Sequence, residues 1–221
     1  MKGSCQVRYA ENEARRKTLQ KQCIVTAATE LFLENGVENV SMVQIAEKGD
    51  VGVATLYRYF STKTNLLLDV GAMLWEDLLR LFDGIFATDG YRDKPGIDQI
   101  GELLGFFLML YREHSGFVRF LQELDACLLR EKPEAEKLRE YEQSIMNIYP
   151  LFAAAYEKAC AEGTAKPGLD AKLLYSAVSH ALTSTSQKFL AGDVLPGDAD
   201  CDKYAELQLL TEVILSYIKI S

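Results

Sequence analysis

Residues 52–63 bring together side chains that suit contacts with DNA. The hydroxyl of Thr55 can hydrogen-bond a base or a phosphate, and the guanidinium of Arg58 can bind guanine or phosphate. The methyl groups of Val53 and Ala54 can touch the methyl group of thymine, and tyrosine hydroxyls commonly contact phosphate. The candidates for the DNA side are Ser41, Met42, Gly52, Val53, Ala54, Thr55, Tyr57, Arg58, Tyr59 and Lys63.

The residues around this group predict the elements that position it. Ser41 and Gln44 have the spacing of a capping box, so we expect a helix to begin near Ser41. A Gly-Asp turn at 49–50 separates it from a second short helix at about 53–59. A major groove admits one α-helix, which reads base edges with side chains near its N-terminus. The two short helices therefore predict a helix-turn-helix.

A preceding amphipathic helix, expected at about 12–35, has to pack against these two helices. Gly36 is placed to end it in the left-handed conformation, and Asp50 tolerates the same conformation in the turn. Lys63 opens a longer helix, where the helix dipole, free N–H groups and the ammonium together favour a phosphate. The side chains expected on the apolar inner face are Val43, Ile45, Ala46, Val51, Leu56 and Phe60, alongside Phe32 and Val40.

The rest of the chain also shows helical periodicity, without a β pattern, an internal repeat or a low-complexity stretch. We expect an all-α protein of about nine helices. Residues 1–62 would form a three-helix DNA-binding domain with the helix-turn-helix, and residues 63–221 a helical bundle for ligand binding and dimerisation. The later helices are expected at about 97–113, 115–130, 133–162, 170–191 and 201–219.

Two prolines and one loop refine this layout. Pro133 suits the first turn of the helix expected at 133–162. Pro150 falls inside that helix, so we expect a kink just before it. Residues 87–96 are expected to form a loop, because they are rich in Gly and Asp and contain a proline.

The charge of the 221-residue chain is unevenly distributed. The net charge is −8, yet residues 1–65 hold nine Lys/Arg and seven Asp/Glu, so this part carries +2 and the remainder −10. Such an asymmetry fits a DNA-facing head on an acidic body. Five scattered cysteines and two histidines show no metal-ligand spacing, so we expect no cofactor, no metal and a reducing cytoplasm. The longest apolar stretch, at 106–111, is too short to span a membrane, and no signal peptide is expected.

The stretch from Ala28 to Leu67 contains a dense and specific set of residues: Ala28, Leu31, Phe32, Gly36, Ile45, Ala46, Val51, Thr55, Leu56, Tyr57, Arg58, Tyr59, Phe60, Lys63, Leu66 and Leu67. With this set, the stretch resembles the N-terminal domain of the TetR family of bacterial transcription regulators. The chain departs from the family pattern in the turn, at Gly49, Asp50 and Gly52, and at Val53. These departures favour modest affinity for DNA or a thymine-rich operator.

The resemblance implies a larger helical domain that binds a small, partly apolar effector and forms a homodimer through helices near 170–191 and 201–219. Each aromatic residue of the middle helices also fits an ordinary core position, and His180 also fits a buried, hydrogen-bonded histidine. The candidates for the effector site are Trp75, Phe106, Met109, Tyr111, Phe120, Tyr149, Phe152 and His180.

The function implied by the resemblance is that of a ligand-responsive regulator. A two-fold dimer would place two reading helices on a palindromic operator, and effector binding would shift the helix that begins at Lys63 and release the DNA. The alternative is a TetR-like protein whose head binds DNA poorly and acts through protein contacts. An enzyme lacks support, because the chain shows no nucleophile–base pair, metal-ligand spacing or glycine-rich phosphate loop.

Overall fold

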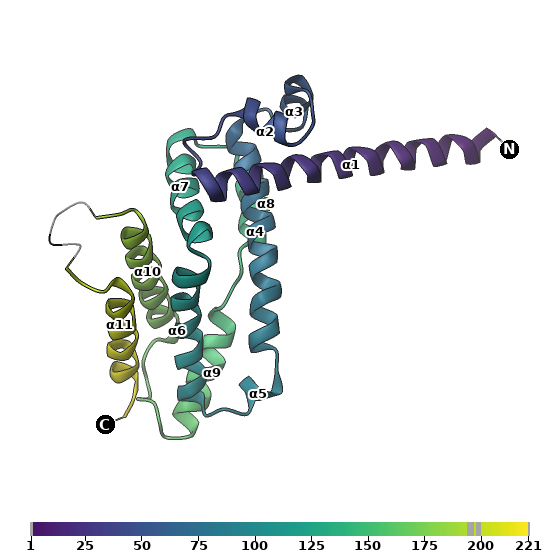
Figure 1. The fold of residues 1–221 in the computed structure, drawn as a ribbon. Coiled ribbons are helices and arrows are strands. Elements are labelled where there is room, and N and C mark those ends of the chain that lie inside the picture. The colour runs from purple at the N-terminus through teal and green to yellow at the C-terminus, as the bar shows by residue number, and fades with distance from the viewer. Residues whose placement is uncertain (1, 194–196, 198–199, 221) are drawn as a thin grey trace. The chain divides into compact units, whose positions relative to one another are not determined.

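The computed structural model describes the backbone of residues 2–193, 197 and 200–220, and the side chains from residue 12 onward (Figure 1). These residues contain eleven helices and one isolated antiparallel bridge between Ala165 and Lys219. The all-α prediction is therefore confirmed, with two helices more than expected. In the part of the chain that is described, no helix has the length and apolar character needed to cross a membrane.

The chain divides into two compact units. The first combines residues up to 74 with residues 123–144, and the second combines residues 75–122 with those from 145 onward. The first unit thus contains, besides the expected head, the beginning of α4 (Lys63–Phe86) and a later segment of the chain. The functional division at residues 1–62 and 63–221 stays a prediction.

The first unit begins with three helices in the expected order: α1 (Lys2–Asn35), α2 (Met42–Lys48) and α3 (Val53–Tyr59). α1 begins ten residues earlier than expected. The expected start rests on the amphipathic pattern of apolar residues, which residues 2–11 lack. The unit is completed by the end of α7 (Ser115–Glu131) and by α8 (Ala135–Ser144). Fully buried side chains of its core include Ile24, Ala28, Ile45, Leu56, Leu66, Val70 and Leu124.

One residue of the expected inner face lies elsewhere. Val43 is 49% exposed, whereas Ile45 and Ala46 of the same helix are buried. α2 spans only two turns, so its core-facing positions are Met42, Ile45 and Ala46, and Val43 falls on the opposite side.

The second unit is centred on α6 (Gly96–Glu113), which packs against α9 (Tyr149–Ala161), α10 (Ala171–Leu190) and α11 (Lys203–Ile218). Asp170 and Asp202 cap α10 and α11, each accepting hydrogen bonds from two N–H groups of the first turn. Aromatic rings fill one end of this core, where Phe86 meets Phe106 with ring centroids 5.7 Å apart.

Two local predictions were wrong. Residues 133–162 form two separate helices, α8 and α9, rather than one kinked helix. Pro150 lies in the first turn of α9, where the missing N–H costs nothing, and Pro133 precedes α8 by two residues. The expected loop at 87–96 contains the short helix α5 (Asp89–Arg92). Thr88 caps this turn, and the buried ring of Tyr91 anchors it against Phe86 with centroids 5.0 Å apart.

The start of α6 approaches α9 very closely. A Cβ added to Gly96 would lie 2.3 Å from the backbone nitrogen of Ala159 and 2.6 Å from the backbone oxygen of Ala155. The N–H of Gly96 donates to the carboxylate of Glu162 at 2.8 Å, and Lys158 donates to the carbonyl of Lys94 at 2.6 Å. A glycine is therefore required at this helix contact for lack of space.

Replacing Gly96 by alanine should lower the free energy of unfolding by about 2 kcal/mol or more, because one of two packed backbones must move. Gly105→Ala is the matched control, since Gly105 lies on the same helix, is exposed and has no atom within 4 Å of an added Cβ. That change should leave stability equal or raise it by about 0.5–1 kcal/mol. Urea denaturation followed by circular dichroism measures both, and equal effects of the two changes would contradict the packing argument.

Candidate DNA-binding surface

The capping box expected at the start of α2 is present. The Ser41 hydroxyl accepts a hydrogen bond from the N–H of Gln44 at 3.3 Å, and the N–H of Ser41 donates to the Gln44 side-chain oxygen at 2.8 Å. The side chains of Ser41 and Gln44 thus each accept a hydrogen bond from a backbone N–H at the start of α2. Ser41 is exposed, but its hydroxyl already serves this structural role.

The turn between α2 and α3 has the expected conformation. Asp50 has a φ of +50°, in the left-handed region, and Val51 donates its N–H to the carbonyl of Ala46 at 3.0 Å. Gly52 is the N-cap of α3 and accepts hydrogen bonds from Thr55 and Leu56 at 2.8 and 3.0 Å through its carbonyl. The atypical Gly-Asp turn therefore still delivers α3 as a complete helix of seven residues.

The exposed face of α3 carries the chemistry predicted for DNA. Val53 and Tyr57 are 37% and 48% exposed, and Ala54 and Arg58 are also exposed. Leu56 is fully buried and fixes the opposite side of the helix in the core. The accessible surface is thus two apolar side chains at the helix start, followed by a phenol and a guanidinium one turn later.

Three residues predicted for the DNA side are engaged inside the unit instead. Met42 is only 7% exposed and belongs to the core, because the first position of α2 faces inward. The Tyr59 hydroxyl donates to Gln20 of α1 at 3.0 Å and is partly buried. Lys63 is the third: it is partly exposed, and its ammonium donates to two backbone carbonyls.

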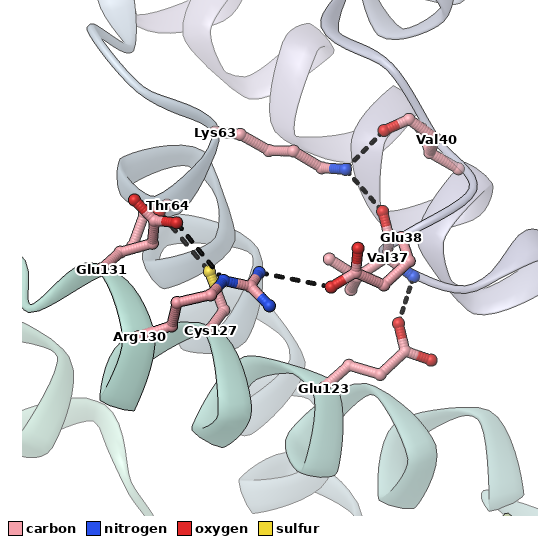
Figure 2. A network of polar contacts seen from close by, with 9 residues as sticks. All are labelled: Val37, Glu38, Val40, Lys63, Thr64, Glu123, Cys127, Arg130 and Glu131. Atoms are coloured by element: carbon pink, nitrogen blue, oxygen red, sulfur yellow. Dashed lines mark hydrogen bonds and ion pairs between the residues drawn. The ribbon is translucent and has the colours of Figure 1, made fainter.

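The ammonium of Lys63 lies between α4 and the loop before α2 (Figure 2). It donates to the carbonyls of Val37 and Val40, both at 2.5 Å, and lies 5.6 Å from the ring centroid of Phe32. Burial lowers the pKa of Lys63, an effect partly opposed by the nearby carboxylate of Glu38. This geometry gives Lys63 a structural role that the local sequence does not indicate, and its contact with phosphate stays a prediction.

Basic side chains also line α1. Arg15 and Arg16 are exposed, as are Lys17 and Lys21. Lys17 pairs with Glu13 at 2.9 Å, and Lys21 pairs with Asp69 of α4. Part of this cationic group therefore serves the fold of the first unit, and the two exposed arginines remain candidates for phosphate contacts.

The predicted effector residues fall into two groups in the second unit. Phe106, Phe120 and Phe152 are at most 3% exposed and are ordinary core residues. Trp75, Met109, Tyr111 and Tyr149 are partly exposed; the Trp75 ring meets Phe117 edge-on at 5.0 Å, and the Tyr149 ring lies 5.8 Å from Tyr175.

His180 is exposed on α10, so the alternative of a buried histidine was wrong, and its role as an effector contact stays a prediction. A cavity of about 160 Å³ has Lys188, Phe189 and Lys203 in its lining, and none of the predicted effector residues line it.

Comparison with known proteins agrees with this description of the head. Residues 24–70 match the family model described as bacterial regulatory proteins, tetR family. An HTH-type transcriptional regulator of Staphylococcus aureus strain MRSA252 is 48% identical over 102 residues, which cover 46% of this chain and 53% of that relative. The chain thus spans about half the length of that curated relative.

Solved structures extend the likeness to the fold of nearly the whole chain. A protein from Saccharomonospora viridis in complex with choline has a TM-score of 0.70 at 17% identity, covering 92% of this chain and 100% of that one. The regulator FadR from Bacillus subtilis in complex with stearoyl-CoA has a TM-score of 0.59 at 18% identity, covering 89% and 98%.

The first unit therefore defines a helix-turn-helix protein. Residues 24–70 match the DNA-binding domain of bacterial regulatory proteins of the tetR family, as the sequence resemblance predicted for the head. The curated relatives are named as regulators of transcription and not as enzymes.

The structural role of Lys63 predicts the result of replacing it by methionine. Two carbonyls of the loop would lose their charged donor, so the free energy of unfolding should fall by about 2–3 kcal/mol. Lys48→Met is the control, because Lys48 forms a surface pair with Glu30 at 2.8 Å and should change stability far less. Urea unfolding measures the free energy of unfolding of both variants. If Lys63→Met is as stable as the parent, the structural role of Lys63 is contradicted and a phosphate contact is favoured.

Proposed function

We propose that this chain is a ligand-responsive repressor that binds a palindromic operator as a homodimer and acts in the cytoplasm. The observation that carries the proposal is the exposed face of α3, held on a capped α2 by a fully buried Leu56. Release of the DNA by a small effector in the second unit completes the proposed cycle.

Base reading is assigned to four exposed residues of α3. Arg58 supplies a bidentate donor for guanine or a phosphate contact, and Tyr57 supplies a hydroxyl for phosphate. Val53 and Ala54 offer only methyl groups, which suit the methyl of thymine. Because Gly52 adds no side-chain donor at the N-cap, we expect a thymine-rich half-site bound with modest affinity.

Dimerisation is assigned to the exposed faces of α10 and α11, which lie side by side in the second unit (Figure 1). Leu209, Val213 and Tyr217 form a stripe at intervals of four residues on α11 and are 57–60% exposed. On α10, Leu173 is 68% exposed, and His180 lies two turns further along the exposed side. A row of exposed apolar side chains is typical of a protein–protein contact, and two copies would bury it in a four-helix interface.

The effector is proposed to bind in the second unit among its partly exposed aromatic residues. Tyr149 and Tyr175 have ring centroids 5.8 Å apart, and Tyr111 lies 6.3 Å from Phe189. Related folds hold choline and stearoyl-CoA, so this architecture accommodates ligands of very different size. A partly apolar molecule is the class that fits rings of this kind.

Replacing Arg58 by alanine should weaken operator binding at least tenfold, because the exposed face of α3 would lose its guanidinium. The operator is first selected from genomic fragments by the parent protein, and affinity is then measured by fluorescence anisotropy at stated salt. Arg119→Ala, at an exposed position of the second unit, removes the same charge and should change affinity by less than twofold. If the parent enriches no fragment, the alternative of a head that acts through protein contacts would be favoured.

Replacing Val213 by aspartate should convert the homodimer into a monomer, because two carboxylates would be buried near the centre of the proposed interface. Size-exclusion chromatography with light scattering measures the mass against 24.8 kDa for one chain. Leu129→Asp is the matched control, since Leu129 is 79% exposed on α7 in the first unit and outside the proposed interface. Dimers of equal stability from both variants would place the interface elsewhere.

A further inference from the structure

The loop of residues 36–41 determines where the helix-turn-helix begins. Gly36 leaves α1 with a φ of +79°, while its N–H still donates to the carbonyl of Phe32 at 2.9 Å. Val37 and Val40 turn their side chains inward and are only 4% and 2% exposed. Since the loop is short and fixed in the core, a displacement of its backbone is passed directly to α2.

Side chains from α4 and α7 hold the backbone of this loop (Figure 2). Lys63 of α4 donates to two of its carbonyls at 2.5 Å. Glu123 of α7 accepts a hydrogen bond from the N–H of Val37. At the surface, Arg130 of α7 pairs with Glu38 at 3.2 Å. Thus α7 contacts the loop through one carboxylate and one guanidinium.

The two contacts made by α7 differ in strength. Arg130 and Glu38 are 58% and 72% exposed, so water and salt weaken their attraction. The bond between Glu123 and Val37 is partly buried, and its charged acceptor makes it stronger than a neutral hydrogen bond. Gly36 permits the approach, because a Cβ there would lie 3.2 Å from a carboxylate oxygen of Glu123.

The helix that carries Glu123 also contributes to the second unit. Residues 115–122 belong to that unit, where Phe117 and Phe120 are buried, whereas residues 123–131 belong to the first. Phe120 and Glu123 are one helical turn apart on a continuous helix. Glu123 therefore lies on the same continuous helix as the buried Phe120.

We propose that Glu123 is a positioning residue for DNA binding. Its carboxylate holds the N–H of Val37, fixes the loop and thereby orients α2 and α3. The proposal rests on the DNA-binding function proposed above. The carboxylate of Glu123 would repel the phosphates of DNA, so direct electrostatics would weaken binding. The proposal instead gives Glu123 a favourable effect on DNA binding.

The test replaces Glu123 by alanine and by glutamine, with Glu134→Ala as the control for lost negative charge on an exposed residue of the same unit. Affinity is measured by fluorescence anisotropy for the duplex selected by the parent and for a scrambled duplex of equal length. Circular dichroism fixes a temperature at which every variant is fully folded. Hydrogen exchange followed by mass spectrometry reports on the backbone of residues 36–45.

We expect the alanine variant to lose about tenfold in affinity for the selected duplex, with unchanged or slightly increased affinity for the scrambled one. The glutamine variant should stay within threefold of the parent, since its side-chain oxygen can still accept from Val37. The control should bind both duplexes as well as the parent or better. Exchange in residues 36–45 should rise only in the alanine variant.

A folded alanine variant that binds the selected duplex as well as the control does would overturn the positioning role. Unchanged exchange in residues 36–45 of the alanine variant would show that Glu123 does not hold the loop.

If the parent protein showed no preference for any duplex, the proposed DNA-binding function would fail. The exchange measurement would then still decide whether Glu123 holds the loop.

Discussion

The ammonium of Lys63 bound to two backbone carbonyls is the interaction on which the arrangement of the head depends. The loop of residues 36–41 is too short to form a helix of its own, so its carbonyls need partners from elsewhere in the chain. Lys63 supplies them from α4 at the expense of partial burial, which lowers its pKa. The position of α2, and through the turn that of α3, follows from this anchoring.

The exposed face of α3 carries few polar groups, because several polar side chains of the head form internal hydrogen bonds. The hydroxyls of Ser41 and Tyr59 and the ammonium of Lys63 all serve internal hydrogen bonds. What remains exposed on α3 is a pair of apolar side chains followed by Tyr57 and Arg58. In the proposed complex with DNA, such a surface would gain specificity from shape and methyl contacts more than from a dense set of donors.

In the second unit, α6 and α9 pack closely, and one face of α11 stays exposed. Gly96 allows α6 and α9 to approach until their backbones nearly touch. α10 and α11 also pack against α6. The apolar stripe of Leu209, Val213 and Tyr217 on α11 stays exposed. Gly96 thus sets how closely α6 and α9 pack in this unit.

The fold class, the three head helices and the residues of α3 could be predicted from the sequence, because short-range signals encode them. The capping pair Ser41 and Gln44, the left-handed Asp50 and the buried Leu56 are all readable from neighbours a few positions away. Tertiary structure alone decided the roles of Lys63 and Glu123 and the burial of Met42. Their partners lie 23 to 86 positions distant or, for Met42, on the other elements of the core, and no local period reports contacts at that range.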